Sequence, residues 1–550
     1  MNKQSGPSES GREPEPLSKG SLLSSKALDA YLKGDPLTKV RDERGREKYD
    51  LLSFGGGSCP KVVGRYAGRF GWKKLCFLTN GSDNGGSTQR IVEALNPEYG
   101  PTLPVGDVTS ALIGLLEPFR YELLNLRSWK LDPQRFTEDE REAFLLAVQD
   151  ISSFHDRLAL AIKWYFNKFD EDGEVRSSRE KFCGELLELG RLVDDVGLIR
   201  PGVKGLDISE ASIRHHIFNA IMIRTGAYDA DRKTPDADQF MVALFLLQSA
   251  LSIDHAIFPC SIDKQVLYAE WVDESGKVIW STKHTSPERP VTALDGQVAL
   301  SNAPDSAKLL KNGGYARYGR FGFDPGLPEP HAYPEAIDAI RRVQPGKPIL
   351  FGPSSFVASI SPCLAVSEVT DEIVKRTDCP RILFLNLTLN SETVGWNVKD
   401  YLDFWELNTG KPVAETLDYI VVNNDIDSTS EVIEALKDKG DTLETYKFRG
   451  PVKLTEEERT TIPQRGVHLV ELPLATVSRT LMRLSSTGER EFVWVPSHDS
   501  KRLMTLSNLL VEDFNERQRP GGPREKTRQF VLDTDGNTKA VIYYPPPENR

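Results

Sequence analysis

The sequence Leu-Cys-Phe-Leu-Thr-Asn-Gly-Ser-Asp-Asn-Gly-Gly-Ser-Thr occupies residues 75–88 and carries much of the information about the fold. Its apolar beginning predicts a short buried strand, and residues 90–95 predict the start of a helix. A strand, a glycine-rich turn and a helix N-terminus together make an anion site, because free backbone N–H groups converge there. Asp83 in this loop is a candidate ligand for a divalent cation. The alternative is a tight turn that needs glycine backbone angles, with Asp83 as a helix N-cap.

The same arrangement occurs twice more in the chain. Residues 48–54 predict a strand that leads into Gly55-Gly56-Gly57-Ser58, and residues 348–351 lead into Gly352-Pro353-Ser354-Ser355. Open parallel sheets bind ligands at the carboxyl ends of their strands, where such loops cluster. The three loops therefore predict one composite pocket for a phosphorylated ligand. None of them matches the Walker pattern or the full dinucleotide fingerprint.

Together with later stretches, these loops carry a resemblance to a known family. Seven groups of residues occur in that family's order, at 55–58, 82–88, 104–108, 215–219, 352–362, 386–395 and 421–423, followed by His498 and Asp499. On these motifs the chain, from about residue 48 to 515, resembles the 2-phospho-L-lactate transferase (CofD) family. The form of the 82–88 loop is closer to the gluconeogenesis-factor (YvcK-like) branch, and the chain resembles a divergent and enlarged member.

The resemblance implies an α/β fold, with a Rossmann-like parallel sheet, helices on both faces, a helical insertion and a smaller α+β section. We expect a disordered tail at 1–22 and a CofD-like domain at 45–515, followed by an extended C-terminal tail at 516–550. The helical insertion is expected at about 130–200 and a β-rich section at about 256–330.

Within these sections the sequence pattern predicts individual elements. Residues 266–280 predict a hairpin, because apolar residues alternate on both sides of a glycine-containing turn. Residues 287–334 are dense in Gly and Pro and predict an irregular connection. Two later strands are predicted at 467–472 and 492–496, and residues 540–544 are considered as an edge strand.

The family motifs imply a set of site residues. Asp83 and Asp107 are the candidate catalytic carboxylates, and Asp83 is the candidate Mg²⁺ ligand. The implied ligand-binding residues are Gly55, Gly56, Gly57, Ser58, Asn84, Gly85, Gly86, Ser87, Thr88, Gly106, His215, Asn219, Gly352, Pro353, Ser354, Ser355, Glu392, Thr393 and Asn423.

Several of these residues also have a purely structural interpretation. Asp107 precedes an apolar stretch at helical spacing, so it is either a helix N-cap or a carboxylate of the ligand site. His215 and Asn219 are four residues apart on a predicted helix and share one face, where they either face a ligand or form a satisfied buried pair. Glu392 either binds a ribose or metal, or caps the next helix.

The chain also departs from the family motifs at positions that bear on the ligand. The second acid of the family's Asp-Asp-Gly-Gly loop is Asn84, and its Gly-Asp-Ile-Arg ends in Thr109. The third residue of the family's Gly-Pro-Gly-Ser motif is Ser354 in this chain. Tyr401 occupies the position of a family histidine that follows the Glu-Thr loop. These departures concern the ligand and the chemistry more than the fold.

The resemblance leaves more than one function open. The first is transfer of a phosphorylated group from a nucleoside-diphosphate-linked donor to a hydroxyl acceptor, assisted by Mg²⁺. The second is a non-catalytic protein that binds a UDP-sugar, as the gluconeogenesis-factor branch is thought to do. The third is a scaffold in which the pocket is vestigial and the helical insertion and tail bind partners.

Composition limits the other possibilities. Of 550 residues, 39% are hydrophobic and 27% charged, which describes an ordinary globular protein. A net charge of −11 argues against broad nucleic-acid binding. The sequence shows neither an apolar run of about 20 residues nor an apolar N-terminal segment, so we expect no membrane span and no secretory signal. Six scattered cysteines without a Cys-x-x-Cys pattern predict a cytoplasmic protein. A homodimer is left open on base rates alone.

Overall fold

The computed structural model describes residues 31–44, 47–81, 95, 99–100, 102–103, 106–126, 129–132, 135–169, 174–198, 211–232, 234–263, 265, 267–281, 317–390, 392–437, 450–483, 490–519, 529–534 and 537–546. The predicted loop at 82–94 therefore lies outside the described residues, as does the predicted tail at 1–22. Pro104, Val105 and Ser391 of the family motifs are outside them too.

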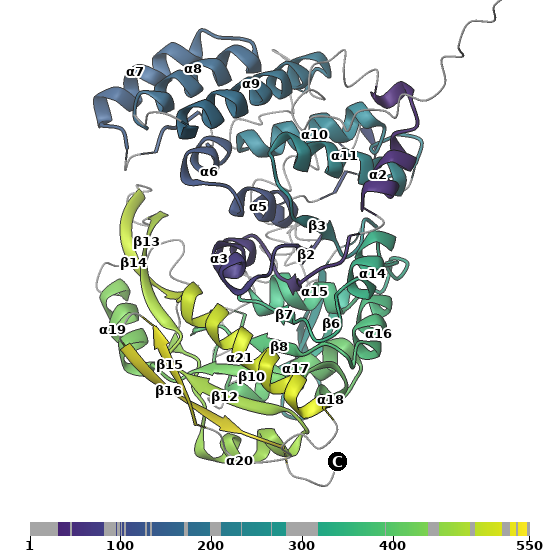
Figure 1. Cartoon of the computed structure of the whole chain (residues 1–550), viewed down its shortest axis with the longest axis vertical. Helices are drawn as coiled ribbons and strands as arrows, with labels where there is room; N and C mark the ends of the chain where they lie inside the picture. The colour runs from purple at the N-terminus through teal and green to yellow at the C-terminus, as the bar shows by residue number, and fades with distance from the viewer. Residues whose placement is uncertain are drawn as a thin grey trace, which may run out of the picture.

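A nine-stranded sheet forms the centre of the described structure, in the order β15-β16-β12-β10-β8-β7-β1-β2-β3 (Figure 1). The strands from β12 to β3 are mutually parallel, and β15 and β16 add an antiparallel hairpin at one edge. The parallel strands are β1 (Leu51–Phe54), β2 (Leu75–Thr79), β3 (Ala256–Pro259), β7 (Ile349–Phe351), β8 (Arg381–Phe384), β10 (Tyr419–Asn423) and β12 (His468–Leu472).

The parallel strands are short and buried along their whole length. Every residue of β1, β2, β7, β8, β10 and β12 is buried. Continuous burial is typical of a parallel sheet, because its crossover helices cover both faces. The Rossmann-like α/β fold predicted from the sequence is confirmed. The strand order changes direction between β1 and β7, which makes this the topological switch point of the sheet.

Helices connect and cover the strands, and α21 crosses the face of the sheet that is nearest the viewer in Figure 1. They are α2 (Pro36–Arg44), α3 (Ser58–Ala67), α5 (Gly106–Gly114), α10 (Ile213–Thr225), α11 (Ala237–Ala250), α14 (Pro334–Arg341), α15 (Ser361–Leu364), α16 (Ser367–Lys375), α17 (Val398–Thr409), α18 (Val413–Thr416), α19 (Ile426–Lys437), α20 (Glu456–Gln464) and α21 (Ser500–Gln518), with a short 3₁₀ turn at Gly68–Phe70 and a π-helical turn at Phe356–Ile360.

A separate helical layer lies at the end of the molecule away from the sheet (Figure 1). It contains α7 (Glu138–Gln149), α8 (Phe154–Phe166) and α9 (Glu174–Asp195), and α6 (Pro118–Leu124) lies between this layer and α5. Thr137 begins α7 with a reciprocal capping box to Glu140, which satisfies backbone groups at the helix start. α7, α8 and α9 fall in the part of the chain for which the sequence predicted a helical insertion.

Three smaller sheets accompany the main one. The predicted hairpin corresponds to β4 (Leu267–Val272) and β5 (Val278–Ser281). The prediction of an irregular connection at 287–334 is wrong for β6 (Arg317–Phe323), which pairs with β4. Gly319 explains the error: a Cβ there would overlap with the Val272 side chain, so the glycine is required by packing within the sheet and does not mark a loop.

The remaining strands occur beyond residue 387. A two-residue pair joins β9 (Thr388–Leu389) to β11 (Gly450–Pro451). An antiparallel hairpin joins β13 (Ala475–Arg483), which the sequence did not predict, to β14 (Arg490–His498). The C-terminal hairpin consists of β15 (Gln529–Thr534) and β16 (Asn537–Tyr544). β16 contains the segment that the sequence suggested as an edge strand, but it lies between β12 and β15, and β15 is the strand at the edge.

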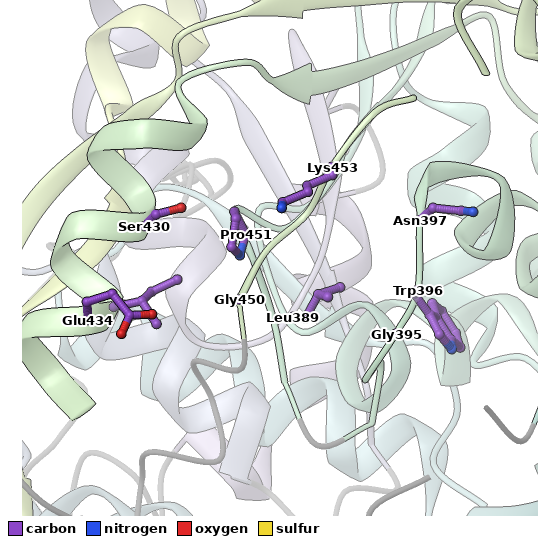
Figure 2. Close-up of a pocket in the computed structure, with 10 residues that line it drawn as sticks. Leu389, Gly395, Trp396, Asn397, Ser430, Glu434, Gly450, Pro451 and Lys453 are labelled. Atoms are coloured by element: carbon purple, nitrogen blue, oxygen red, sulfur yellow. The ribbon is translucent and has the colours of Figure 1, made fainter. Parts of the chain in front are cut away.

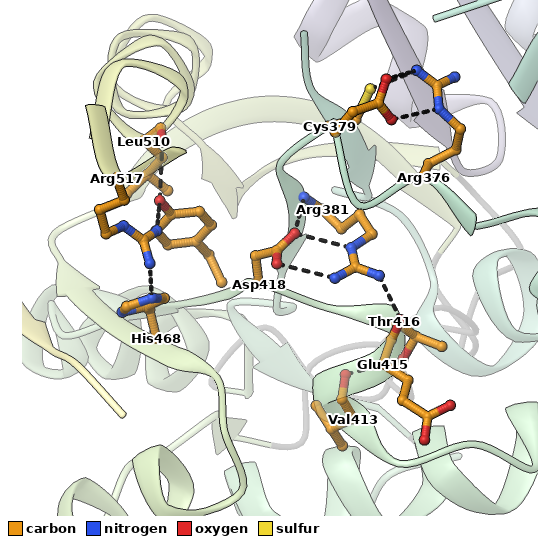
Figure 3. Close-up of polar contacts among 12 residues, drawn as sticks. Arg376, Cys379, Arg381, Val413, Glu415, Thr416, Asp418, His468, Leu510 and Arg517 are labelled. Carbon is orange, nitrogen blue, oxygen red and sulfur yellow. Dashed lines mark hydrogen bonds and ion pairs between the residues drawn. The ribbon is translucent and has the colours of Figure 1, made fainter. Parts of the chain in front are cut away.

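A buried polar network attaches the C-terminal hairpin to the sheet, and Figure 3 shows the part of it around Arg517 and His468. The Tyr419 hydroxyl donates to Asp513 Oδ2 at 2.8 Å, and the Tyr543 hydroxyl lies 2.5 Å from His468 Nδ1. Arg517 contacts the other ring nitrogen of His468 and the Tyr419 hydroxyl. Burial, and then the positive charge of Arg517, lowers the pKa of His468 well below its usual value, so the imidazole is neutral.

All six cysteines are buried and free, as the absence of a disulfide pattern in the sequence predicted. No helix in the described part of the chain is both long and apolar enough to span a bilayer.

Candidate functional site

The switch point brings two of the predicted glycine-containing loops into direct contact. The loop after β1 begins at Gly55 and the loop after β7 begins at Gly352. The Gly56 N–H donates to Ser354 Oγ at 2.8 Å, and the Gly352 N–H donates to the Phe54 carbonyl at 2.8 Å. The prediction that these loops form one site is consistent with this geometry.

The glycines after β1 allow close packing that a side chain would prevent. A Cβ on Gly56 would lie 2.6 Å from Ser359 Oγ and 2.7 Å from Asp107 Oδ1. A Cβ on Gly57 would overlap with the Ser110 side chain, because α5 packs against this loop. The glycines are therefore required by the approach of α5 and of the turn at Phe356–Ile360.

The backbone N–H groups of this loop already have acceptors. Gly55 donates to the Leu78 carbonyl at 3.0 Å, Gly56 to Ser354, and Gly57 to the Asp107 carboxylate. A phosphate bound by these three groups would have to displace protein acceptors. The loop therefore acts in this structure mainly by holding Asp107 and Ser354 in place.

Asp107 is the carboxylate at the centre of this arrangement. It lies in the first turn of α5, which begins one residue earlier at Gly106, and it accepts hydrogen bonds from Gly57 and from the Ser359 hydroxyl. Its Oδ2 is buried and has no hydrogen-bond partner among the described residues. Burial raises the pKa of Asp107 to about 6, and the two hydrogen bonds oppose the increase. Of its two predicted roles, the ligand-site carboxylate fits these contacts better than the N-cap.

The loop after β8 joins the same region through Glu392. Ser355 donates to Glu392 Oε2 at 3.3 Å, and the Asn390 amide donates to the same oxygen at 3.1 Å. Thr393 is buried and bonds to Asn390, which closes the turn. Glu392 therefore links the loops after β7 and β8, and it does not cap the helix α17, which is capped by Asn397.

The end of β2 reaches the same loops through Asn80. Its amide donates to the Ala358 carbonyl at 3.0 Å. The continuation of this loop carries the predicted residues Asp83, Asn84, Gly85, Gly86, Ser87 and Thr88, which lie outside the described residues, as does the side chain of Ser58.

Helix α10 carries His215 and Asn219, both of which are buried. Ser212 Oγ lies 3.3 Å from His215 Nδ1, and the Asn219 amide donates to the His215 carbonyl at 2.8 Å. Asn219 Oδ1 is buried without a hydrogen-bond partner in the described structure. The structure confirms that the pair lies on one helix.

Arg214, next to His215, is the residue that connects α10 to α5. Its guanidinium donates to Thr109 Oγ1 at 3.3 Å and to Ser110 Oγ at 3.2 Å. Thr109 is the position at which the family motif has arginine, so the guanidinium of Arg214 lies beside that position.

Two other residues from the family motifs have mainly structural contacts. Asn423 Oδ1 accepts from the backbone N–H groups of Leu474 and Ala475, and its amide donates to Thr429, so it fixes the end of β10 to the chain after β12. Tyr401 is fully buried, and burial raises the pKa of its hydroxyl.

Sequence reasoning missed Ser359 and Asn80 as site residues. Ser359 bonds Asp107 from within the π-helical turn, and Asn80 fixes that turn to β2. Asn386, at the end of β8, also carries a buried Oδ1 without a partner among the described residues. Ser359 and Asn386 lie within the family motifs at 352–362 and 386–395, and Asn80 follows a buried strand, but none of the three was named as a site residue.

A cleft of about 520 Å³ adjoins the loop after β8 (Figure 2). Glu434 lines it from α19, and Lys453 lines it from the chain after β11. This volume is suited to a small molecule. The loop that contains Glu392 therefore contacts the loop after β7 and also borders the cleft. The lining residues are Leu389, Gly395, Trp396, Asn397, Ser430, Ile433, Glu434, Gly450, Pro451 and Lys453.

The described residues contain no group of three or more His, Cys, Asp or Glu side chains that is placed to hold a metal ion. The candidate ligand Asp83 is not among those residues, so the predicted Mg²⁺ site stays a prediction.

Comparison with known proteins gives the family. Two crystal structures of a UPF0052-family protein from Bacillus halodurans are similar to this chain, with 17% and 16% identity and a TM-score of 0.49 each. They cover 83% and 84% of this chain and 98% and 100% of their own. No curated protein matches the chain. Residues 52–462, more than half of the sequence, match the family described as 2-phospho-L-lactate transferase CofD. The chain belongs to the CofD family.

Proposed function

We propose that this protein binds a nucleoside-diphosphate-linked ligand at the switch point and transfers a phosphorus-containing group from it to a hydroxyl acceptor. The observation that carries this proposal is Asp107, whose buried Oδ2 has no partner in the described structure and lies beside the loops after β1 and β7. An unsatisfied buried carboxylate oxygen at a switch point favours a site for a cation or for a hydrogen-bond donor of a ligand. Family membership supports a transferase-like role.

The residues present fit Mg²⁺. Mg²⁺ is bound in phosphate sites by one or two carboxylates together with the phosphates of the substrate, and Asp107 offers such an oxygen. Asp107 and the sequence-predicted ligand Asp83 would hold the ion. When bound, Mg²⁺ neutralises negative charge on the diphosphate.

The protein's own part in the reaction is positioning. Phosphoryl transfer has a loose transition state, so correct placement of donor and acceptor provides most of the rate enhancement. The contacts from Gly57 and Ser359 fix the orientation of Asp107. The hydrogen bond between Ser355 and Glu392 fixes the loop after β8 to the loop after β7, which begins at the switch point. The acceptor hydroxyl attacks the distal phosphorus, the bond to the bridging oxygen breaks, and a nucleoside monophosphate leaves.

One observation favours a second function, that of a non-catalytic UDP-sugar-binding regulatory protein of the gluconeogenesis-factor type. Ser354 replaces a glycine of the family motif, and its hydroxyl accepts the Gly56 N–H. A backbone donor that could bind phosphate is thereby occupied. Together with Asn84, this contact favours binding without turnover.

A thermal-shift and turnover experiment distinguishes the two functions. GDP and UDP-N-acetylglucosamine are each added with Mg²⁺ or with EDTA, and a ligand at about 100 times its dissociation constant should stabilise the fold by about 2.7 kcal/mol. The transferase predicts a shift that requires Mg²⁺ and decreases in Asp107→Asn. The regulatory protein predicts a shift with the UDP-sugar that persists in EDTA. Unchanged melting with every ligand contradicts both functions.

A further inference from the structure

The hairpin formed by β13 and β14 has one buried and one exposed face. Val493 and Val495 of β14 are 1% and 7% exposed and lie on the face packed against α19. Trp494, between them, is 59% exposed, and Val477 of β13 is 47% exposed. Because neighbouring side chains of a strand point to opposite faces, Trp494 lies on the face away from α19. Val477 pairs with Pro496, so it shares the face of Trp494.

This exposed face begins at the carboxyl end of the main sheet. His498 follows Trp494 by four residues on the same strand, so it has the same orientation, and its Nε2 lies 3.2 Å from the Leu385 carbonyl just after β8. Four strand residues span about 13 Å, which is the approximate separation of Trp494 from that contact. In Figure 1 the hairpin extends from the sheet toward the helical layer, alongside the end of the sheet where α3 and α5 begin.

Trp494 is an unusual residue for this exposed position. Several large hydrophobic side chains are strongly exposed in the described part of the chain, and Trp494 is the only aromatic one among them. A tryptophan offers a wide planar face, and nucleobases stack on such faces regardless of their identity. Among the described residues of this face, Val477 and Trp494 are the large exposed apolar ones, and they provide far less than the about 800 Å² that each partner buries in a stable dimer.

We propose that the face of the hairpin that carries Val477 and Trp494 stacks against the nucleobase of the ligand held at the strand ends. The inference rests on the proposed function and adds the residue that recognises the planar ring. The base and the diphosphate then contact different parts of the protein: the base lies on β14, and the diphosphate lies at the loops after β1 and β7.

The test compares three variants of the full chain with the unchanged protein. Trp494→Ala removes the ring, and Trp494→Phe retains an aromatic face. Leu146→Ala removes a side chain of α7 that is 66% exposed and serves as the control for loss of exposed apolar surface. The probes are GDP and UDP-N-acetylglucosamine, and inorganic pyrophosphate, which lacks a base. Dissociation constants are measured by titration calorimetry with Mg²⁺, and the oligomeric state by light scattering.

The proposal predicts that Trp494→Ala weakens nucleotide binding about tenfold or more and leaves pyrophosphate binding unchanged, whereas Trp494→Phe stays within about threefold of the unchanged protein. Leu146→Ala should bind all probes normally. Unchanged nucleotide binding in Trp494→Ala overturns the inference alone and leaves the proposed function in place. A change from dimer to monomer with unchanged affinity assigns the face to a second copy and also overturns it. No nucleotide binding by the unchanged protein overturns both.

Discussion

The Gly56 N–H donates a hydrogen bond to Ser354 Oγ at 2.8 Å, and this contact joins the two halves of the sheet at its switch point. The two residues lie on loops after different strands, 298 positions apart in the sequence. The hydrogen bond is buried, so loss of the Ser354 hydroxyl would leave the Gly56 N–H without an acceptor. It also holds the loop after β1 in the position where Gly57 reaches Asp107.

Ser354→Ala should destabilise the fold, because it leaves the buried Gly56 N–H without an acceptor. We expect the free energy of unfolding to fall by about 1–3 kcal/mol, measured by urea denaturation. Ser367→Ala, at an exposed serine at the start of α16, is the matched control and should change it by less than about 0.5 kcal/mol. Equal stability of the two variants would show that water or another group replaces the hydroxyl.

Gly56→Ala should be strongly unfavourable, because the new methyl group would lie 2.6 Å from Ser359 Oγ and 2.7 Å from Asp107 Oδ1. Overpacking of this kind costs about 1–3 kcal/mol, and it should also abolish ligand binding by displacing Asp107. Gly68→Ala is the control, since no atom lies within 4 Å of its Cβ position and its φ of −60° suits alanine. This control should be neutral or stabilising by up to about 1 kcal/mol. Thermal unfolding and calorimetry of both variants provide the comparison.

Asp107 should make the stability depend on pH between about 4 and 6. Burial raises its pKa from 3.8 to about 6, so in this range the folded state holds a proton that the unfolded state has lost. The contribution of Asp107 to the free energy of unfolding should therefore decrease as the pH rises through this window, by an amount on the order of 2–3 kcal/mol, measured as the difference between the unchanged protein and Asp107→Asn. Asp107→Asn should remove this decrease.

Urea denaturation at pH values from 4 to 7.5 measures this dependence. Asp231→Asn, at an exposed position, should keep the slope of the unchanged protein. Parallel curves for Asp107→Asn and the unchanged protein would show that Asp107 titrates in the folded state near its usual pKa.

The contribution of His468 to the stability of the fold should increase as the pH rises, opposite to that of Asp107. Its folded-state pKa is far below the usual 6.5, because it is buried beside Arg517, so the unfolded state binds the proton first as the pH falls. The contribution of His468 to stability should therefore be lost below pH 6.5, by about 2 kcal/mol between pH 6.5 and 5, in opposition to the contribution of Asp107. His468→Gln should be less stable at pH 7, because it loses its contact with Tyr543, yet it should show a smaller loss on acidification. Circular dichroism during denaturation at the two pH values tests this, and a loss as large as that of the unchanged protein would contradict it.

Local patterns were sufficient to predict most of the parallel strands of the main sheet, whereas β15 was not predicted. β1, β2, β7, β8, β10 and β12 are short apolar or β-branched runs, and the turns after β1 and β7 contain glycine. Burial on both faces produces such runs directly, so each strand is visible without knowledge of its neighbours. β6 and β13 were missed, because their residues are set by cross-strand partners such as Val272 and by one solvent-exposed face.

The sequence alone determined the sheet, its glycine loops and the family to which the chain belongs. The tertiary structure alone decided that Asp107 meets Gly57 and Ser359, that Arg214 lies beside Thr109, and that Glu392 bonds Ser355. It also decided that Asn423 joins two strand ends. The physical reason is that strand formation depends on the burial of neighbouring residues in the chain, whereas each of these contacts depends on the order of strands in the sheet, which places distant loops at one edge.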